Sequence, residues 1–346
     1  MSEITYGDAV KWAIVEEMRG DPRVFVMGQD LQTGLYADVV DEFGRERIRN
    51  TPICETGFYG AGIGAALTGM RPVIEAAYST FFYSGMDQIA NQAAKSRYMF
   101  GGQASVPLVI RAAVAYGIAA AAHHSDRPWG LFAQIPGLKI VVPSTAYDAK
   151  GLMKSAIRDG NPVLWFDDYS LLSSREEVPE TEYTIPLGLA DIKRAGSDIT
   201  IVALAAAVHH SLAAADMLRD EGISAEVVDL RSVSPLDRRT VLNSVWKTGR
   251  LVAVDAAPGT CSVASEVAAT VAEYAFECLK APIIRLTAPD SPVPFSPQLE
   301  NLMYPTTEAI VGAARKACSP HSSSGNGELK AGQAAFAEWA QHRSVR

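Results

Sequence analysis

Short apolar segments alternate with helix-length amphipathic segments along most of this 346-residue chain. Such alternation is typical of α/β domains, in which parallel strands form a sheet and the helices between them cover its two faces. We therefore predict an α/β fold with two doubly wound domains. The predicted strands are 24–28, 72–76, 107–112, 139–143 and 163–166 in the first half, and 199–204, 225–230, 251–254 and 283–286 in the second.

Helices are predicted between these strands from the spacing of apolar residues and from capping residues. An amphipathic helix capped by Thr5 begins the chain. The polar, proline-containing stretch 172–190 separates two α/β patterns. We expect domains at 1–175 and 191–318, a linker at 176–190 and a flexible tail at 319–346. The other predicted helices are 82–98, 146–158, 208–221, 237–247, 262–279 and 306–317.

The composition argues against several classes of protein. A net charge of −8 disfavours a nucleic-acid-binding protein. No apolar run reaches the roughly 20 residues of a membrane span, and the N-terminus has no basic signal region, so we expect a soluble cytoplasmic protein. Four widely spaced cysteines predict buried reduced thiols, and not disulfides or a zinc site; they are Cys54, Cys261, Cys278 and Cys318.

Residues 51–69 place one acid, Glu55, directly before a run of glycines and alanines. The pattern predicts a strand that delivers a carboxylate to a cleft, followed by a helix with small side chains that allows close packing. A buried carboxylate is unfavourable by several kcal/mol unless it is paired or protonated. Glu55 is therefore a candidate for proton chemistry, the alternative being a structural buried glutamate.

The glycines of this run superficially resemble a dinucleotide-binding loop. The third glycine of the G-x-G-x-x-G fingerprint is missing, because GIG at 62–64 is followed by two alanines. A P-loop lysine is missing as well. We therefore disfavour an NAD-binding oxidoreductase and interpret the run as a close-packed helix at an interface.

Several motifs follow one another in a fixed order. They are GQD at 28–30, ETGFYGAGIGAAL at 55–67, RPVIE at 71–75, MDQIANQAAKSRYMFGGQ at 86–103, HHS at 123–125 and VDLRSVSPLD at 228–237. The series, over roughly residues 4–317, resembles the β subunit of the thiamine-diphosphate-dependent E1 component of 2-oxo acid dehydrogenases. That group includes pyruvate, branched-chain and acetoin dehydrogenase β chains. The resemblance implies a thiamine-diphosphate pyrimidine-binding domain followed by a transketolase C-terminal domain.

The resemblance also assigns roles to three side chains. The family's glutamate falls on Glu55, whose carboxyl would share a proton with N1′ of the cofactor's aminopyrimidine; an apolar cleft suits that exchange. The family's aromatic residue falls on Phe81, with Phe82 as the alternative, and packs on the pyrimidine ring. The active-site histidine falls on His124, with His123 as its rival, and acts on the substrate as an acid or base.

The chain departs from the family's pattern beside His124. Asp126 stands where relatives usually carry glutamine, Arg-Pro-Trp follows at 127–129, and the preceding loop at 112–122 contains less glycine than usual. We expect all of these changes at the substrate mouth, where they bear on the substrate and not on the cofactor.

Two further expectations concern ions and subunits. The family's K⁺ site, built mainly from backbone carbonyls, would fall on Leu108, Ala156, Asp159 and Asn161, the alternative being an ordinary helix C-terminus. The G-D-G motif and later asparagine that hold Mg²⁺ and diphosphate are missing from this chain. The resemblance therefore implies that an α subunit supplies the Mg²⁺ site and that an α₂β₂ heterotetramer holds the cofactor between its chains.

The activity implied by the resemblance is decarboxylation of a pyruvate-like 2-oxo acid, with transfer of the acyl unit to a lipoyl E2 partner. An alternative is a biosynthetic enzyme subunit that passes a two-carbon ketol or acyl unit to a carrier protein. A non-catalytic scaffold subunit is disfavoured because both Glu55 and His124 are present.

Overall fold

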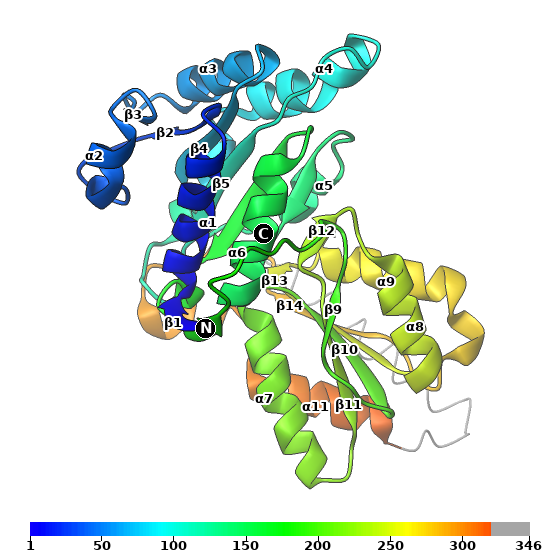
Figure 1. The fold of residues 1–346 in the computed structure, drawn as a ribbon. Coiled ribbons are helices and arrows are strands. Elements are labelled where there is room, and N and C mark those ends of the chain that lie inside the picture. Colours follow the sequence, from blue (N-terminus) through cyan, green and yellow to red (C-terminus); the bar gives the residue numbers. More distant parts are fainter. Residues whose placement is uncertain (320–346) are drawn as a thin grey trace.

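The computed structural model describes residues 1–319 as two α/β domains lying side by side (Figure 1). The first contains a seven-stranded sheet of order β12-β6-β7-β5-β4-β2-β3, and the second a five-stranded sheet of order β14-β13-β10-β11-β9. The predicted fold class of two doubly wound domains is confirmed. The tail predicted at 319–346 lies outside the described residues from residue 320 onward.

The first sheet is parallel except for its edge strand β12 (Ser232–Ser234), which pairs antiparallel with β6. For each strand predicted in this half, both the first and the last residue lie within two positions of those of an observed strand. The strand β3, which was not predicted, is only three residues long. The parallel strands are β2 (Val24–Gly28), β3 (Ile48–Asn50), β4 (Arg71–Tyr78), β5 (Val109–Val114), β6 (Lys139–Val141) and β7 (Val163–Asp168).

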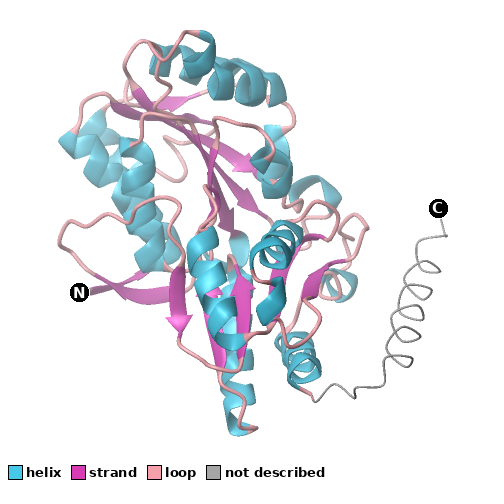
Figure 2. Ribbon diagram, turned by 90° about the vertical axis from the view of Figure 1, so that its right-hand side faces the viewer, coloured by secondary structure: helices cyan, strands magenta, loops and turns pink. Residues whose placement is uncertain are grey.

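Helices cover both faces of this sheet, as Figure 2 shows. Because successive strand residues point to opposite faces, Val24 and Val26 pack with α1 (Tyr6–Gly20) and α6 (Ala146–Arg158). Their neighbours in β2 face the layer that contains α3 (Glu55–Leu67), α4 (Ala94–Met99) and α5 (Trp129–Ala133). Strands buried on both faces read as continuous apolar runs, which is why the sequence revealed them.

Side-chain caps set the start of the two helices on the first face. The Thr5 hydroxyl accepts a hydrogen bond from the Asp8 N–H at 3.0 Å, as predicted. Thr145 caps α6 in the same way, with the Asp148 N–H at 3.1 Å. The helix α6 has the predicted bounds of 146–158.

The predicted linker is a packed segment. It begins within β8 (Arg175–Val178), which pairs antiparallel with the N-terminal strand β1 (Ser2–Thr5). Further along, the buried Ile185 donates its N–H to the carbonyl of Gly151 in α6 at 3.1 Å. Neither strand was predicted, because each is short and is stabilised by a partner far away in the sequence.

The segment after β4 differs from the single helix predicted at 82–98. A 3₁₀ turn, η2 (Ser79–Phe82), is followed by turns, a π-helical stretch η3 (Gln88–Ala93) and then α4. A Cβ atom at Gly85 would lie 2.1 Å from the ring of Tyr59. The chain therefore passes closely over that ring before the helix begins.

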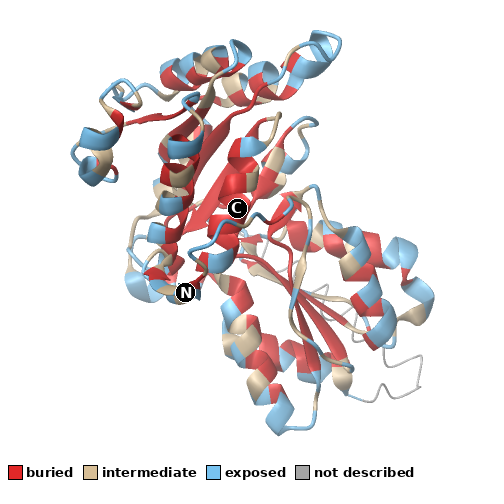
Figure 3. Ribbon diagram, viewed as in Figure 1, coloured by how far each residue is buried: buried red, intermediate tan, exposed pale blue. Residues whose placement is uncertain are grey.

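The second domain follows the predicted order. Its parallel strands are β10 (Ile199–Ala203), β11 (Ala225–Asp229), β13 (Leu251–Pro258) and β14 (Ile284–Ala288), with β9 (Asp191–Arg194) antiparallel at the edge. The helices α7 (Ala206–Asp220) and α11 (Thr307–Cys318) cover one face, and α8 (Arg238–Thr248) and α9 (Val263–Tyr274) the other. The strands of both sheets are largely buried (Figure 3).

One apolar core extends across both domains, from Phe82 and Phe166 to Val228 and Val267. The strand β12, which comes from the second half of the chain, completes the sheet of the first domain. The two domains therefore share both a core and a sheet edge.

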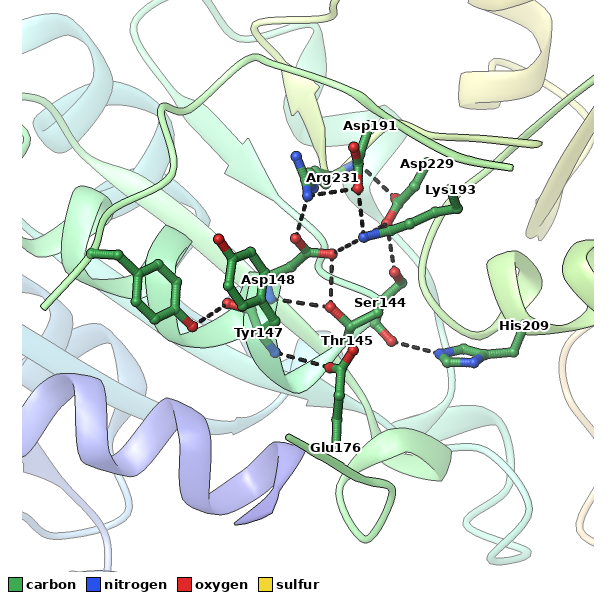
Figure 4. Close-up of polar contacts among 11 residues, drawn as sticks. Ser144, Thr145, Tyr147, Asp148, Glu176, Asp191, Lys193, His209, Asp229 and Arg231 are labelled. Atoms are coloured by element: carbon green, nitrogen blue, oxygen red, sulfur yellow. Dashed lines mark hydrogen bonds and ion pairs between the residues drawn. The ribbon is translucent and has the colours of Figure 1, made fainter. Parts of the chain in front are cut away.

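A buried charge network also joins the domains (Figure 4). The Arg231 guanidinium contacts the carboxylates of Asp148 in α6 and Asp191 in β9, the latter at 2.8 Å. The Lys193 ammonium contacts the same two carboxylates, with Asp191 at 2.9 Å. Because both cations bridge both acids, no single pair accounts for the junction.

Asp229, like Asp148, is fully buried in this junction. Its carboxylate accepts hydrogen bonds from the Ser144 hydroxyl and, at 3.0 Å, from the Arg231 N–H. Burial, together with the nearby charge of Asp148, raises the pKa of Asp229 to about 6. The Ser144 carbonyl lies 2.7 Å from Nε2 of His209, which extends the junction to α7.

Two further findings concern the cysteines and the helices of the described residues. The expectation of buried thiols is wrong, because Cys54 and Cys261 are exposed and Cys278 and Cys318 are partly buried; all four are free. Within residues 1–319, no helix is both long enough and apolar enough to span a membrane.

Candidate active site

The residues singled out from the sequence follow the carboxyl ends of neighbouring strands. Gln29 follows β2, Phe81 follows β4, and the loop carrying His124 follows β5; these strands lie next to one another in the order β5-β4-β2. The chain passes from β3 on one side of β2 to β4 on the other, so the strand order reverses here. Ligands of open α/β sheets bind in the crevice at such a switch point.

Glu55 is half-buried and is the first residue of α3. The predicted strand before it is absent, because β3 ends at Asn50 and residues 51–54 are irregular. Its Oε1 accepts a hydrogen bond from Nε2 of Gln29 at 3.3 Å, the one hydrogen-bond partner of this carboxylate within residues 1–319. The first turn of a helix is a favourable place for a negative charge.

The helix α3 packs closely on the sheet, and its outer face carries small residues. A Cβ at Gly62 would lie 2.4 Å from the end of the Ile74 side chain in β4, so a larger residue here would force that side chain to move. On the opposite side, Gly57, Ala61 and Gly64 are exposed. The small residues thus serve two surfaces, one inside the domain and one facing away from it.

The two candidate phenylalanines have different environments in the structure. Phe82 is 0% exposed and packs in the core against the rings of Phe132 and Phe166, at centroid distances of 5.7 and 5.3 Å. Phe81 is half-buried, and its ring lies 5.6 Å from the imidazole of His124. Only Phe81 is therefore free to contact a ligand without unpacking the core.

The hydrogen bonds of His124 define its tautomer. Its Nδ1 lies 3.1 Å from the carbonyl oxygen of Ala120. Because a carbonyl can only accept, Nδ1 carries the hydrogen, and Nε2 of the neutral ring has a free lone pair. The ring of Tyr78, the last residue of β4, meets the imidazole edge-on at 4.6 Å.

The rival His123 is exposed, and its carbonyl accepts a hydrogen bond from the Thr80 hydroxyl. Phe81 and His124 are therefore brought together, whereas His123 faces solvent. Tyr78 was not predicted from the sequence. Its position three residues before Phe81, at the end of an apolar strand, is the signal that could have identified it.

The departures at 126–129 have mainly structural explanations. Asp126 is half-buried and accepts a hydrogen bond from the Tyr83 hydroxyl at 3.1 Å. Arg127 is buried, and its guanidinium lies 3.8 Å from the Asp168 carboxylate. Trp129 is fully buried. Arg127 and Trp129 therefore do not line the substrate mouth, contrary to the prediction.

One buried hydroxyl close to Glu55 lacks a partner. The hydroxyl of Tyr59, in the second turn of α3, makes no hydrogen bond within residues 1–319. Burial raises its pKa, and the negative charge of Glu55 raises it further. A carboxylate with a free oxygen, an available aromatic ring and an orphaned hydroxyl fit an aminopyrimidine, which offers both donors and a flat face.

The residues of the predicted cation site lie where β5 meets the end of α6. The carbonyls of Leu108 and Ala156 accept N–H groups at 2.8 and 3.3 Å, respectively. The Asp159 carbonyl accepts a hydrogen bond from the Arg71 guanidinium at 3.1 Å. Burial alone would raise the pKa of Asp159, but the Lys139 ammonium and Asn161 hold it below its usual value.

Within the described part of the chain, residues 1–319, no group of three or more His, Cys, Asp or Glu side chains is arranged to hold a metal ion.

Comparison with known proteins first defines the class. Residues 2–172 match the transketolase pyrimidine-binding domain, and residues 188–310 match the transketolase C-terminal domain. A solved structure titled "Split gene transketolase, inactive beta4 tetramer" has the same fold, with a TM-score of 0.77 at 25% identity over 91% of this chain and 98% of that one. The chain thus has the domains and the fold of a transketolase-type protein.

Three relatives come from Bacillus subtilis (strain 168). The acetoin:2,6-dichlorophenolindophenol oxidoreductase subunit beta is 46% identical over 89% of this chain and 95% of its own length. The pyruvate dehydrogenase E1 component subunit beta is 44% identical, and the 2-oxoisovalerate dehydrogenase subunit beta 42%, each over 91% of this chain and 99% of its own length. The chain belongs to this family of E1 β subunits, which are thiamine-dependent oxidoreductases.

Proposed function

We propose that this chain is the β subunit of a two-chain E1 enzyme that decarboxylates a 2-oxo acid with thiamine diphosphate. Two contacts at the switch point of the first sheet support the proposal: Glu55 with Gln29, which follows β2, and Phe81, which follows β4, with His124, in the loop after β5. The 2-oxo acid would lose CO₂, and its acyl unit would pass to the disulfide of a lipoyl group on an E2 partner, which is thereby reduced.

Glu55 would hold and exchange a proton with the pyrimidine nitrogen N1′ of the cofactor. Gln29 occupies one oxygen of the carboxylate and leaves the other for this contact. Phe81 would pack against the pyrimidine face. When bound, thiamine diphosphate would supply a carbon nucleophile for the keto group and a positively charged ring that accepts the electron pair left behind when CO₂ departs.

His124 would act on the substrate side. The bond from Nδ1 to the Ala120 carbonyl leaves Nε2 to accept a proton from a substrate hydroxyl or, once protonated, to donate to a substrate oxygen. Tyr78 and Phe81 flank the ring and restrict its rotation. The imidazole is thereby held in one orientation before substrate arrives.

The diphosphate and Mg²⁺ would be held by an α subunit in an α₂β₂ heterotetramer. The motif for these groups is missing from this chain, and the exposed small-residue face of α3 is suited to close packing against another chain. The "inactive" β4 tetramer of the structural relative agrees with a β chain that needs a partner. A cytoplasmic location agrees with the lack of a spanning helix within residues 1–319.

A K⁺ ion at Leu108, Ala156, Asp159 and Asn161, bound mainly by backbone carbonyls, remains part of the proposal. The Arg71 guanidinium already contacts the Asp159 carbonyl, so the ion would have to share that oxygen or displace the arginine. Comparing turnover in K⁺ and in tetramethylammonium buffers tests this. Equal rates in both buffers would contradict the proposed K⁺ site.

A second candidate substrate is acetoin, a hydroxyketone. Two acetoin:2,6-dichlorophenolindophenol oxidoreductase β subunits, from Bacillus subtilis and Cupriavidus necator, are 46% and 48% identical to this chain. A base at Nε2 of His124 would serve this reaction as well, since cleavage of acetoin requires removal of its hydroxyl proton.

The deciding experiment combines the chain with its α subunit, thiamine diphosphate and Mg²⁺. Reduction of 2,6-dichlorophenolindophenol is then followed with pyruvate, 2-oxoisovalerate and acetoin as separate substrates. Turnover of a 2-oxo acid supports the main proposal, and turnover of acetoin alone supports the second. A system that turns over none of the three, while the cofactor is bound, contradicts both.

A further inference from the structure

A buried acid of the second domain contacts the loop that carries His124. Glu300, at the end of α10 (Pro297–Glu300), is 1% exposed. Its two carboxylate oxygens accept the backbone N–H groups of Gly117 and Ala119, each at 3.1 Å. A buried carboxylate that receives two N–H groups from one loop, in a bidentate manner, restrains the shape of that loop.

Three residues of this loop have positive φ angles. Gly117, Ala119 and Ala121 have φ angles of 72°, 53° and 59°, so every second residue lies in the left-handed region. Two of these three residues, Gly117 and Ala119, are the ones whose N–H groups the Glu300 carboxylate accepts.

A second contact comes from the same segment of the second domain. The ring of Tyr304 meets the ring of Tyr116 at 4.3 Å, and the Arg127 guanidinium lies 4.2 Å from the Tyr304 ring centroid. Glu300 and Tyr304 thus hold the loop before and after His124. This explains why Arg127 is buried and does not face the substrate mouth.

The loop transmits this restraint to the imidazole. Ala120 lies between the two strained alanines, and its carbonyl is the group that accepts the hydrogen from Nδ1 of His124 at 3.1 Å. For Ala121, a φ of 59° with a ψ of −169° is a conformation that side chains other than glycine rarely adopt. Such a conformation persists only when surrounding contacts enforce it, and Glu300 supplies two of them.

We propose that Glu300 is a positioning residue that sets the tautomer of His124 through the backbone of residues 117–121. The consequence for turnover rests on the proposed function of His124, whereas the effect on the tautomer does not. In the absence of the carboxylate, the loop relaxes, the Ala120 carbonyl turns away, and the imidazole hydrogen is no longer confined to Nδ1.

The variants isolate the carboxylate. Glu300→Gln keeps the size of the side chain but places an amide N–H₂ group against one of the two loop N–H groups. Glu300→Asp keeps the charge on a shorter side chain and should have an intermediate effect. The matched control is Glu226→Gln, since Glu226 is also buried in the second domain and accepts the Gly196 N–H at 3.2 Å, but contacts no residue of the loop.

The first measurement uses the full-length chain labelled with ¹⁵N-histidine. Long-range ¹H–¹⁵N spectra report the tautomer of each of the six histidines, and His124→Gln identifies the signal of His124. We expect the Nδ1–H tautomer in the wild type and in Glu226→Gln, and an increased Nε2–H population in Glu300→Gln. An unchanged His124 tautomer in folded Glu300→Gln or Glu300→Asp would overturn the proposal.

The second measurement uses the assembled enzyme with its α subunit. We expect kcat of Glu300→Gln to fall by roughly tenfold to a hundredfold, with KM changed by less and with cofactor C2–H exchange unchanged. An equal loss in Glu226→Gln would reduce Glu300 to a structural residue. If the wild type turns over no substrate, the proposed function fails, and the tautomer measurement alone decides the role of Glu300.

Discussion

The amide nitrogen of Gln29 lies 3.3 Å from Oε1 of Glu55, so the end of β2 orients the carboxylate at the start of α3. The two residues are 26 positions apart in the chain and meet only because β2 and β3 are neighbours in the sheet. A single acceptor oxygen is thereby left for a ligand, which is the arrangement that a proton-sharing carboxyl requires.

Glu55→Gln should nearly abolish turnover while the complex with the α subunit still assembles. Glutamine preserves the shape and the bond to Gln29 but cannot exchange a proton with N1′. Cofactor C2–H exchange in the assembled enzyme should slow by at least about 10²–10⁴-fold. Gln29→Ala leaves the carboxylate in place and should lower turnover by only about tenfold. Wild-type exchange in Glu55→Gln would remove Glu55 from the mechanism.

His124→Ala should impair the steps that follow cofactor activation and leave C2–H exchange almost unchanged, because the proposed role of its imidazole is on the substrate side. A loss of about 10²–10⁴-fold in single-turnover rate is expected for one acid–base group. His123→Ala is the matched control and should be mild, since this side chain is exposed. The assignment of the two histidines would be reversed by a more severe effect of His123→Ala.

The isolated chain should bind thiamine diphosphate weakly or not at all, and adding the α subunit should restore binding. The reason is that the Mg²⁺ and diphosphate motif is missing from its sequence. Isothermal titration calorimetry of the chain alone and of the assembled enzyme measures the difference. Sub-micromolar affinity without the partner would disprove the proposal that this chain provides only part of the cofactor site.

Ala121→Gly should raise the free energy of unfolding by about 0.5–1 kcal/mol. The alanine is held at a φ of 59°, where a Cβ is unfavourable by roughly 1–2 kcal/mol and glycine is not, although glycine loses about 0.5–1 kcal/mol of that gain to chain entropy. Ala120→Gly is the control, since Ala120 has no positive φ, and it should destabilise the protein by about 0.5–1 kcal/mol. Urea unfolding of the three proteins tests both signs.

Asp229→Asn should change how stability depends on pH. The pKa of this acid is raised to about 6 in the folded protein, against about 3.9 when unfolded, so the folded state binds the proton more tightly. Ionisation of Asp229 therefore lowers the free energy of unfolding as the pH rises from about 4 to about 6, by at most about 3 kcal/mol. Above about pH 6 the loss is complete.

The variant lacks this ionisation, so its stability relative to wild type should increase across that pH window and then level off. Denaturant unfolding of both proteins between pH 4 and pH 7 measures the difference. The charged residues around position 229 are the same in both proteins, so their own ionisation cancels, to first order, when the two stabilities are compared. These residues are Asp148, Asp191, Lys193 and Arg231. A constant difference across the range would show that Asp229 is ionised in the fold throughout.

Much of the fold could be predicted because its signals are local. The strand at 24–28 and the helix at 146–158 were predicted with their observed bounds, since the strand is a continuous apolar run and the helix begins at a threonine cap. The family was recognisable as well, because its motifs follow one another along the chain. Glu55 and His124 could be singled out for the same reason.

The resemblance favoured Phe81 over Phe82 and His124 over His123, but only the tertiary structure gave a physical reason for either choice. Phe82 is buried in the core, whereas Phe81 is half-buried. In the 3₁₀ turn that contains both histidines, His123 is exposed and His124 is half-buried. The loop strain and its contact with Glu300, 181 residues from Ala119, were not predictable either. Local patterns report how a segment buries its own surface, whereas these choices depend on partners that only the folded chain brings together.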